Sequence, residues 1–188
     1  GIEPHTGPPG MTPDERSLVS APRLPLIKPT SDDPHVWLDP FLAVREVERI
    51  RDGLMAADPK NREMYARNAE VYMLKLLDLD REIRGMLNSL TKREFVAFHP
   101  AFRYFAYEYE LIEVAVIEEV PGEEPSPAEL ARLADEVKKR GVRVIFSEPQ
   151  FSPRIVETLA RDYGLRIAEL DPLETGELRA DYYEEVLR

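Results

Sequence analysis

Residues 33–40, which read Asp-Pro-His-Val-Trp-Leu-Asp-Pro, separate a proline-rich leader from the part of the chain that has the sequence patterns of a folded protein. The stretch holds the only tryptophan and one of three histidines, His35. At its end, Asp39 is a favourable N-cap and Pro40 a favourable first helical residue, so a helix is expected to begin here. In residues 1–32 the prolines are too closely spaced for a long helix, and extended or turn structure is expected.

The composition is typical of a globular protein. The chain has 188 residues, of which 43% are hydrophobic and 32% charged, enough for one domain or one and a half. Its formal net charge of -11 argues against a protein that binds the nucleic-acid backbone, because no basic field is available. The absence of cysteine excludes disulfides, iron–sulfur clusters and thiol nucleophiles. No stretch approaches the roughly 18 consecutive apolar residues of a membrane span.

Two helices are expected after this stretch. Apolar residues recur at helical spacing until Asp58 and Pro59 break the pattern, which predicts a helix over 40–57. A longer helix is predicted over 61–90, where apolar residues alternate at spacings of four and three. At 1.5 Å per residue it would be roughly 45 Å long. That length suits either a stiff strut between two bodies or an antiparallel hairpin with the first helix, and the pattern leaves both open.

From residue 91 the pattern changes to short strands that alternate with helices. The predicted strands cover residues 95–98, 111–117, 142–146 and 165–170, and the predicted helices cover 100–109, 126–140, 153–163 and 182–187. This alternation implies right-handed crossovers between parallel strands. We therefore predict an α/β fold in which helices flank a parallel four-stranded sheet, preceded by a long rigid helix.

Three of the predicted strands are followed by a titratable side chain and then directly by proline. These side chains are His99, Glu148 and Asp171. The carboxyl ends of parallel strands lie along one edge of a sheet, where ligands bind, so the three side chains are expected at the same edge. His35 lies in a comparably rigid loop after Pro34. Two imidazoles and one or two carboxylates that converge there would suit a zinc or manganese ion.

Other interpretations of these residues remain open. Taken singly, each is more often a helix cap, a turn former or a hydrogen-bonded core group than a ligand. His5 lies among prolines and glycines of the leader, where a solvated side chain is expected. No glycine-rich phosphate-binding motif, HExxH motif or GxSxG motif is present. The alternative function is a metal-dependent hydrolase that uses His35, His99 and Asp171 around an open coordination position, although no general base is evident.

Five segments resemble the signature segments of a known family, in the same order and at suitable spacing. They cover residues 33–40, 98–105, 124–127, 146–151 and 170–173. The family comprises the zinc- and manganese-binding solute-binding proteins of ABC import systems. The resemblance implies two α/β lobes joined by one long rigid helix, with the metal held between them. It also implies an extracytoplasmic protein, peripheral to the membrane, that hands its ion to an ABC permease and is not an enzyme.

The same resemblance implies roles for individual residues. His35, His99 and Asp171 match metal ligands of the family, and Glu148 matches a supporting residue close to the site. Residues 61–90 match the connecting helix, which favours the strut. A histidine at position 99 is usual for zinc, while Asp171 keeps manganese possible.

The sequence departs from the family in its first part. The family has an N-terminal lobe with a further histidine ligand before the 33–40 segment, and residues 1–32 are too short to form it. We therefore divide the chain into a leader or linker (1–32), a helical segment with the connecting helix (33–90) and a C-terminal α/β metal-binding lobe (91–188). With one ligand and half of the enclosure missing, this chain alone is expected to bind metal more weakly than a two-lobed protein.

Overall fold

The computed structural model describes residues 29–30, 32–120, 122–176 and 179–188. The expectations for the leader up to residue 28, and for His5, lie outside these residues. Four parallel strands form one sheet in the order β2-β1-β3-β4. The strands are β1 (Glu94–Ala97), β2 (Ile112–Val116), β3 (Val144–Ser147) and β4 (Arg166–Glu169). The predicted α/β fold with a parallel four-stranded sheet is confirmed.

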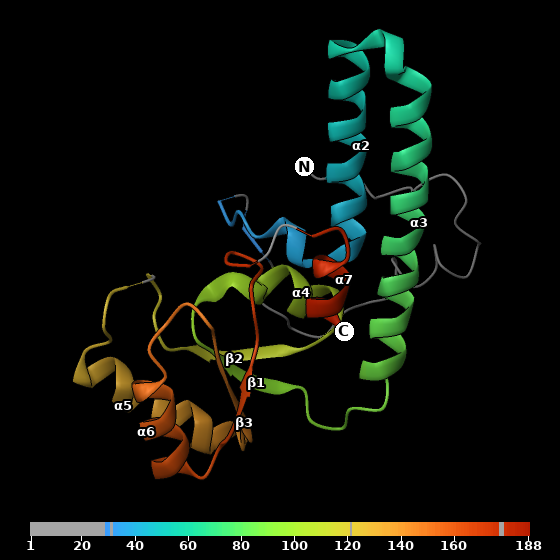
Figure 1. Cartoon of the computed structure of the whole chain (residues 1–188). Helices are drawn as coiled ribbons and strands as arrows, with labels where there is room; N and C mark the ends of the chain where they lie inside the picture. The colour runs from blue at the N-terminus through green and yellow to red at the C-terminus, as the bar shows by residue number, and fades with distance from the viewer. Residues whose placement is uncertain (1–28, 31, 121, 177–178) are drawn as a thin grey trace.

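One face of the sheet packs against α5 (Pro127–Arg140) and α6 (Arg154–Tyr163), which lie together on the same side of it (Figure 1). Ser126 and Glu129 form a capping box at the start of α5. Both helices end at a glycine in the left-handed conformation. The buried core between these elements comprises Val96, Phe98, Ile117, Leu133, Val137, Val142, Ile145, Val156, Leu159 and Ala160.

The other face of the sheet carries η3 (Pro100–Phe102), α4 (Arg103–Glu108) and α7 (Tyr182–Leu187). The segment 100–109 was expected to be one helix, but its first turn is a 3-10 turn, a frequent start for a helix. α7 has the predicted bounds. None of the helices in the described part of the chain has the length and apolar character that crossing a bilayer requires.

Two long helices, α2 (Pro40–Ala57) and α3 (Arg62–Leu87), lie side by side as an antiparallel hairpin that projects from the sheet (Figure 1). The Asp39 side chain accepts hydrogen bonds from the first backbone N–H groups of α2, which confirms the predicted cap. The antiparallel packing of α2 against α3 confirms the hairpin interpretation. The strut interpretation stays a prediction, because the described residues contain one α/β body, and the three-part division of the chain stays a prediction as well.

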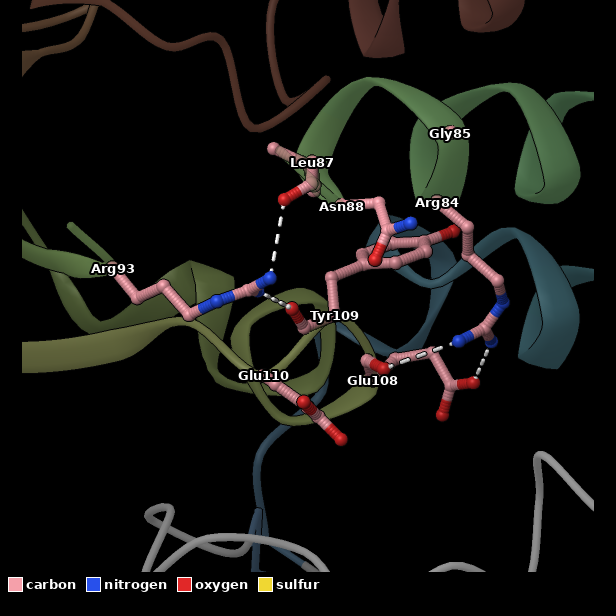
Figure 2. Close-up of a pocket in the computed structure, with 8 residues that line it drawn as sticks. All are labelled: Arg84, Gly85, Leu87, Asn88, Arg93, Glu108, Tyr109 and Glu110. Atoms are coloured by element: carbon pink, nitrogen blue, oxygen red, sulfur yellow. Dashed lines mark hydrogen bonds and ion pairs between the residues drawn. The ribbon is translucent and has the colours of Figure 1, made fainter. Parts of the chain in front are cut away.

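The carboxyl end of α3 is fixed to the amino-terminal edge of the sheet by two arginines that line a pocket of about 340 Å³ (Figure 2). Arg84 forms ion pairs with Asp80 on its own helix and with Glu108 at the end of α4. Arg93, just before β1, donates to the backbone carbonyls of Leu87 at 3.1 Å and Tyr109 at 2.9 Å. We call the group Asp80, Arg84, Arg93, Glu108 and Tyr109 the arginine joint.

The 33–40 segment is tied to the opposite edge of the sheet. The indole Nε1 of Trp37 donates to the carbonyl of Pro172 at 2.9 Å, and the Tyr183 hydroxyl donates to the carbonyl of Trp37 at 2.5 Å. Leu38 is fully buried in the core beneath. These contacts bring His35 over the carboxyl ends of the strands. His35 thus lies close to the residues that follow β1, β3 and β4, although it is far from them in the sequence.

Candidate metal centre

The His35 ring is held by the aspartate two residues before it. Asp33 Oδ1 accepts the backbone N–H of His35 at 3.1 Å and lies 2.7 Å from Nδ1 of the ring. Pro34 between them restricts the backbone, so the pair forms a short rigid loop. A carboxylate at Nδ1 favours a proton on that nitrogen, which leaves Nε2 as the ring's lone-pair donor. Nε2 lies 3.2 Å from Oε1 of Glu174.

His99, two residues past the end of β1, is held in the same way by Glu148, which follows β3 directly. Nδ1 of His99 lies 2.5 Å from Oε2 of Glu148, and its backbone N–H donates to Oε1 at 3.2 Å. Both side chains are at most 2% exposed. Burial lowers the pKa of His99, but the hydrogen bond and negative charge of Glu148, followed by those of Glu174, raise that pKa above its ordinary value.

Glu174 completes a group of three with the two imidazoles. Its Oε1 lies 3.7 Å from Nε2 of His99, and the two rings lie with their centroids 5.4 Å apart. One donor atom from each of the three residues lies within 4.8 Å of the others. Within the described residues, this is the one group of histidine, cysteine or carboxylate side chains with the spacing to hold a metal ion.

These separations fit zinc. Zinc bonds to histidine nitrogen and carboxylate oxygen are about 2.0–2.2 Å long, so neighbouring donors of a tetrahedral site lie about 3.3–3.6 Å apart. The 3.2 Å and 3.7 Å separations between the imidazole nitrogens and Glu174 Oε1 bracket that range. The carboxylates behind both rings are the partners that metal-bound histidines commonly have.

Asp171, predicted as a ligand, lies outside this group. Its Oδ1 accepts the backbone N–H of Leu173 at 2.8 Å, and its Oδ2 accepts the Tyr182 hydroxyl at 2.7 Å. The carboxylate thus closes its own turn, an arrangement frequent for aspartate after a strand. Leu173 in this turn has a φ of 62°, which directs the next residue, Glu174, to the histidines.

Sequence reasoning therefore placed His35, His99 and Glu148 at one edge of the sheet but overlooked Glu174 and Asp33. The signal for Asp33 was available, because an aspartate two residues before a histidine can reach its Nδ1. The signal for Glu174 was weaker. It required recognising that an Asp-Pro-Leu-Glu turn with a left-handed third residue carries its fourth residue back over the strand end.

Known proteins are similar to this chain in both sequence and fold. A model of the family described as "Zinc-uptake complex component A periplasmic" matches residues 1–188. The high-affinity zinc uptake system protein ZnuA of Bacillus subtilis is 41% identical over 142 residues, which cover 76% of this chain and 44% of that protein. The zinc-binding protein AdcA of Streptococcus pyogenes is 39% identical over 142 residues, which cover 76% of this chain and 28% of that protein. The chain thus spans less than half of these relatives.

The fold is similar to solved structures of the same kind. A crystal structure of ZnuA shares 37% identity with a TM-score of 0.73, over 82% of this chain and 58% of that one. A zinc-bound mutant variant of AdcAII from Streptococcus pneumoniae shares 33% identity with a TM-score of 0.74, over 82% of this chain and 56% of that one. The match of the family model to the whole chain identifies the protein as a member of the periplasmic zinc-uptake component A family.

Proposed function

We propose that this chain is part of an extracytoplasmic protein that captures zinc, with His35, His99 and Glu174 as ligands, and delivers it to an ABC permease. The observation that carries the proposal is the arrangement of the two Nε2 atoms around one oxygen of Glu174, with a carboxylate behind each Nδ1. The family's zinc-uptake description and the names of the relatives support zinc as the cargo.

The chemistry of the donor set also favours zinc over manganese. Two imidazole nitrogens and one carboxylate oxygen are common zinc ligands, whereas manganese suits sites richer in oxygen. Asp33 and Glu148 fix the protonated nitrogen of each ring, so both rings can offer Nε2 without rearrangement. Manganese remains the alternative cargo.

Three protein ligands leave a four-coordinate zinc ion one position short. We propose that this position is taken by a histidine of a first lobe, as the resemblance to two-lobed solute-binding proteins implies. Asp171, as predicted from the sequence, is the other candidate, but it would first have to give up its bonds to Leu173 and Tyr182. We place it second for that reason.

The proposed activity is capture and release without turnover. The family is a component of an uptake complex, and the printed names of the relatives describe binding and uptake. The partner is the permease of an ABC importer, and the location is outside the cytoplasmic membrane, which agrees with the periplasmic family description and the lipoprotein relative of Streptococcus pneumoniae.

Calorimetric titration of the purified chain with zinc tests this function. One zinc ion per chain should bind, and His99→Ala should abolish binding, because it removes the buried ligand that β1 positions. His5→Ala is the matched control, since it removes a histidine from the leader, and it should leave binding unchanged. Absence of zinc binding by the folded chain, or equal binding by the His99→Ala variant, would refute the proposal.

A further inference from the structure

We propose that Gln150 positions Glu174 so that this residue offers a single oxygen to the metal, which makes Gln150 a determinant of zinc selectivity. The inference rests on the proposed function, because it takes Glu174 as a zinc ligand. Gln150 lies in the turn after β3, two residues beyond Glu148. It touches both the carboxylate behind His99 and the carboxylate that faces the two imidazoles.

The Gln150 amide bridges the two carboxylates through one nitrogen. Nε2 donates to Oε2 of Glu148 at 3.1 Å and to Oε2 of Glu174 at 3.3 Å. The amide oxygen, Oε1, is buried and has no hydrogen-bond partner within the described residues. A flipped amide would direct this oxygen at two carboxylates, so the negative charges of Glu148 and Glu174 favour the orientation in which Nε2 faces them.

This bond gives the two oxygens of Glu174 different roles. Oε2 is engaged with Gln150, while Oε1 faces the Nε2 atoms of His35 and His99 at 3.2 Å and 3.7 Å. The hydrogen bond from Gln150 competes with a metal ion for Oε2 and therefore favours binding through Oε1 alone. Zinc accepts such a ligand in a four-coordinate site, whereas manganese and other hard cations gain from additional oxygen ligands.

Glu174 needs this support because the turn directs the residue towards the histidines but leaves its side chain partly exposed. Its side chain is 35% exposed, far more than that of either histidine. It follows Leu173, whose left-handed backbone is unfavourable for a branched residue. Within the described residues, the bond from Gln150 is the one hydrogen bond that reaches Oε2 of Glu174. Gln150 therefore compensates for the exposure of the ligand that the turn presents.

Two measurements on the full chain test the role of Gln150. The first is the affinity for zinc against that for manganese, from competition with a chromogenic chelator. The second is the visible absorption of the cobalt(II)-substituted protein, which is intense for four-coordinate and weak for higher-coordinate cobalt. Gln150→Ala should weaken zinc binding about 10-fold, at the lower end of the range for residues that support metal ligands. It should also reduce the zinc-to-manganese affinity ratio and the cobalt absorption.

Two further variants serve as controls for these measurements. Gln150→Met keeps the length of the side chain and its lack of charge but cannot donate a hydrogen bond, so it should change all three readouts in the same direction as Gln150→Ala. Asn68→Ala removes an exposed amide from α3 and should change none of them. Equal zinc affinity, selectivity and cobalt spectra for Gln150→Ala and the unaltered chain would overturn the role of Gln150 and leave the proposed function standing.

A double-substitution cycle separates Glu174 from Glu148 as the route of the effect. If Gln150 acts through Glu174, adding Gln150→Ala to Glu174→Ala should weaken zinc binding no further. A further 10-fold loss in that background would show that Gln150 acts through Glu148, which would refute the inference. Absence of zinc binding by the unaltered chain would instead refute the proposed function and this inference with it.

Discussion

The two edges of the sheet both bury carboxylates, but they neutralise them differently. At the amino-terminal edge, the arginine joint pairs Asp80 and Glu108 with the permanently charged guanidinium of Arg84. At the carboxyl-terminal edge, Glu148 contacts the imidazole of His99 and accepts hydrogen bonds from the backbone N–H of His99 and the amide of Gln150. A guanidinium is always protonated, whereas an imidazole is neutral or charged according to its surroundings.

This difference separates a structural joint from a binding site. Burial lowers the pKa of Arg84, but Asp80 and Glu108 raise it above its ordinary value, so Arg84 remains a permanent cation beside these two carboxylates. The raised pKa of His99 shows that the other edge also attracts positive charge. There, however, no arginine or lysine of the described residues pairs with Glu148 or Glu174, and a proton or a metal ion can take that place. The exchangeable cation is what makes the edge suitable for capture and release.

The largest effect is expected from a substitution that breaks the arginine joint. Arg84→Met should lower the free energy of unfolding by about 3 kcal/mol, because it leaves Asp80 and Glu108 without their cation. We expect the lower end of the range for buried pairs, since the Arg84 side chain is 31% exposed. Urea denaturation measures the change.

The control for this variant is Arg81→Met on the same helix, where an exposed pair with Asp78 should contribute little to stability. Zinc affinity of the Arg84→Met variant, measured under conditions in which it is folded, should be unchanged. A loss of zinc affinity as large as the loss of stability would contradict the separation of the two edges.

A smaller effect is expected from the carboxylate behind His99. Glu148→Gln should weaken zinc binding about 10-fold to 100-fold, because an amide that donates to Nδ1 leaves the ring proton on Nε2, where the metal should bind. Calorimetry measures the affinity, and Glu124→Gln, an exposed substitution of the same type, is the control. Unchanged affinity in the Glu148→Gln variant would show that this carboxylate does not set the state of the ring.

The smallest expected effect is a change with pH in the stability that Asp39 contributes. Burial, then the charge of Glu108, raises the pKa of Asp39 well above its ordinary value. Because the folded pKa exceeds the unfolded one, the stabilising contribution of the protonated side chain is lost as the pH rises through the folded pKa. Asn also caps helices well, so Asp39→Asn should keep the cap and remove this loss. Its advantage in stability over the unaltered chain should grow as the pH rises from the ordinary pKa of an aspartate to the raised pKa of Asp39.

Asp58→Asn provides the opposite case. Hydrogen bonds from Asn61 and Tyr65 lower the pKa of Asp58, so its contribution is present at neutral pH and is lost as the pH falls through the lowered folded pKa. The substitution should therefore reduce stability at neutral pH and have no effect in acid. Thermal denaturation across a pH series measures both variants. An Asp39→Asn curve that runs parallel to that of the unaltered chain would refute the assignment of the raised pKa.

The order of the elements and part of the site followed from local rules. The cap at Asp39, the capping box at Ser126 and the left-handed glycines at Gly141 and Gly164 each act within a few residues, so the sequence is sufficient to place them. The rule that strand ends share an edge of a parallel sheet then placed His99 and Glu148 together across 49 residues of sequence.

The sequence by itself thus determined the α/β fold, the helical hairpin as one of two alternatives, and the edge at which the histidines meet. Only the tertiary structure decided which acidic residue faces them. Asp171 and Glu174 lie in one turn, and which of them points to the histidines depends on the hydroxyl of Tyr182, 11 residues after Asp171, and on the amide of Gln150, 24 residues before Glu174. The direction of a turn side chain depends on such distant partners, and local sequence patterns do not encode them.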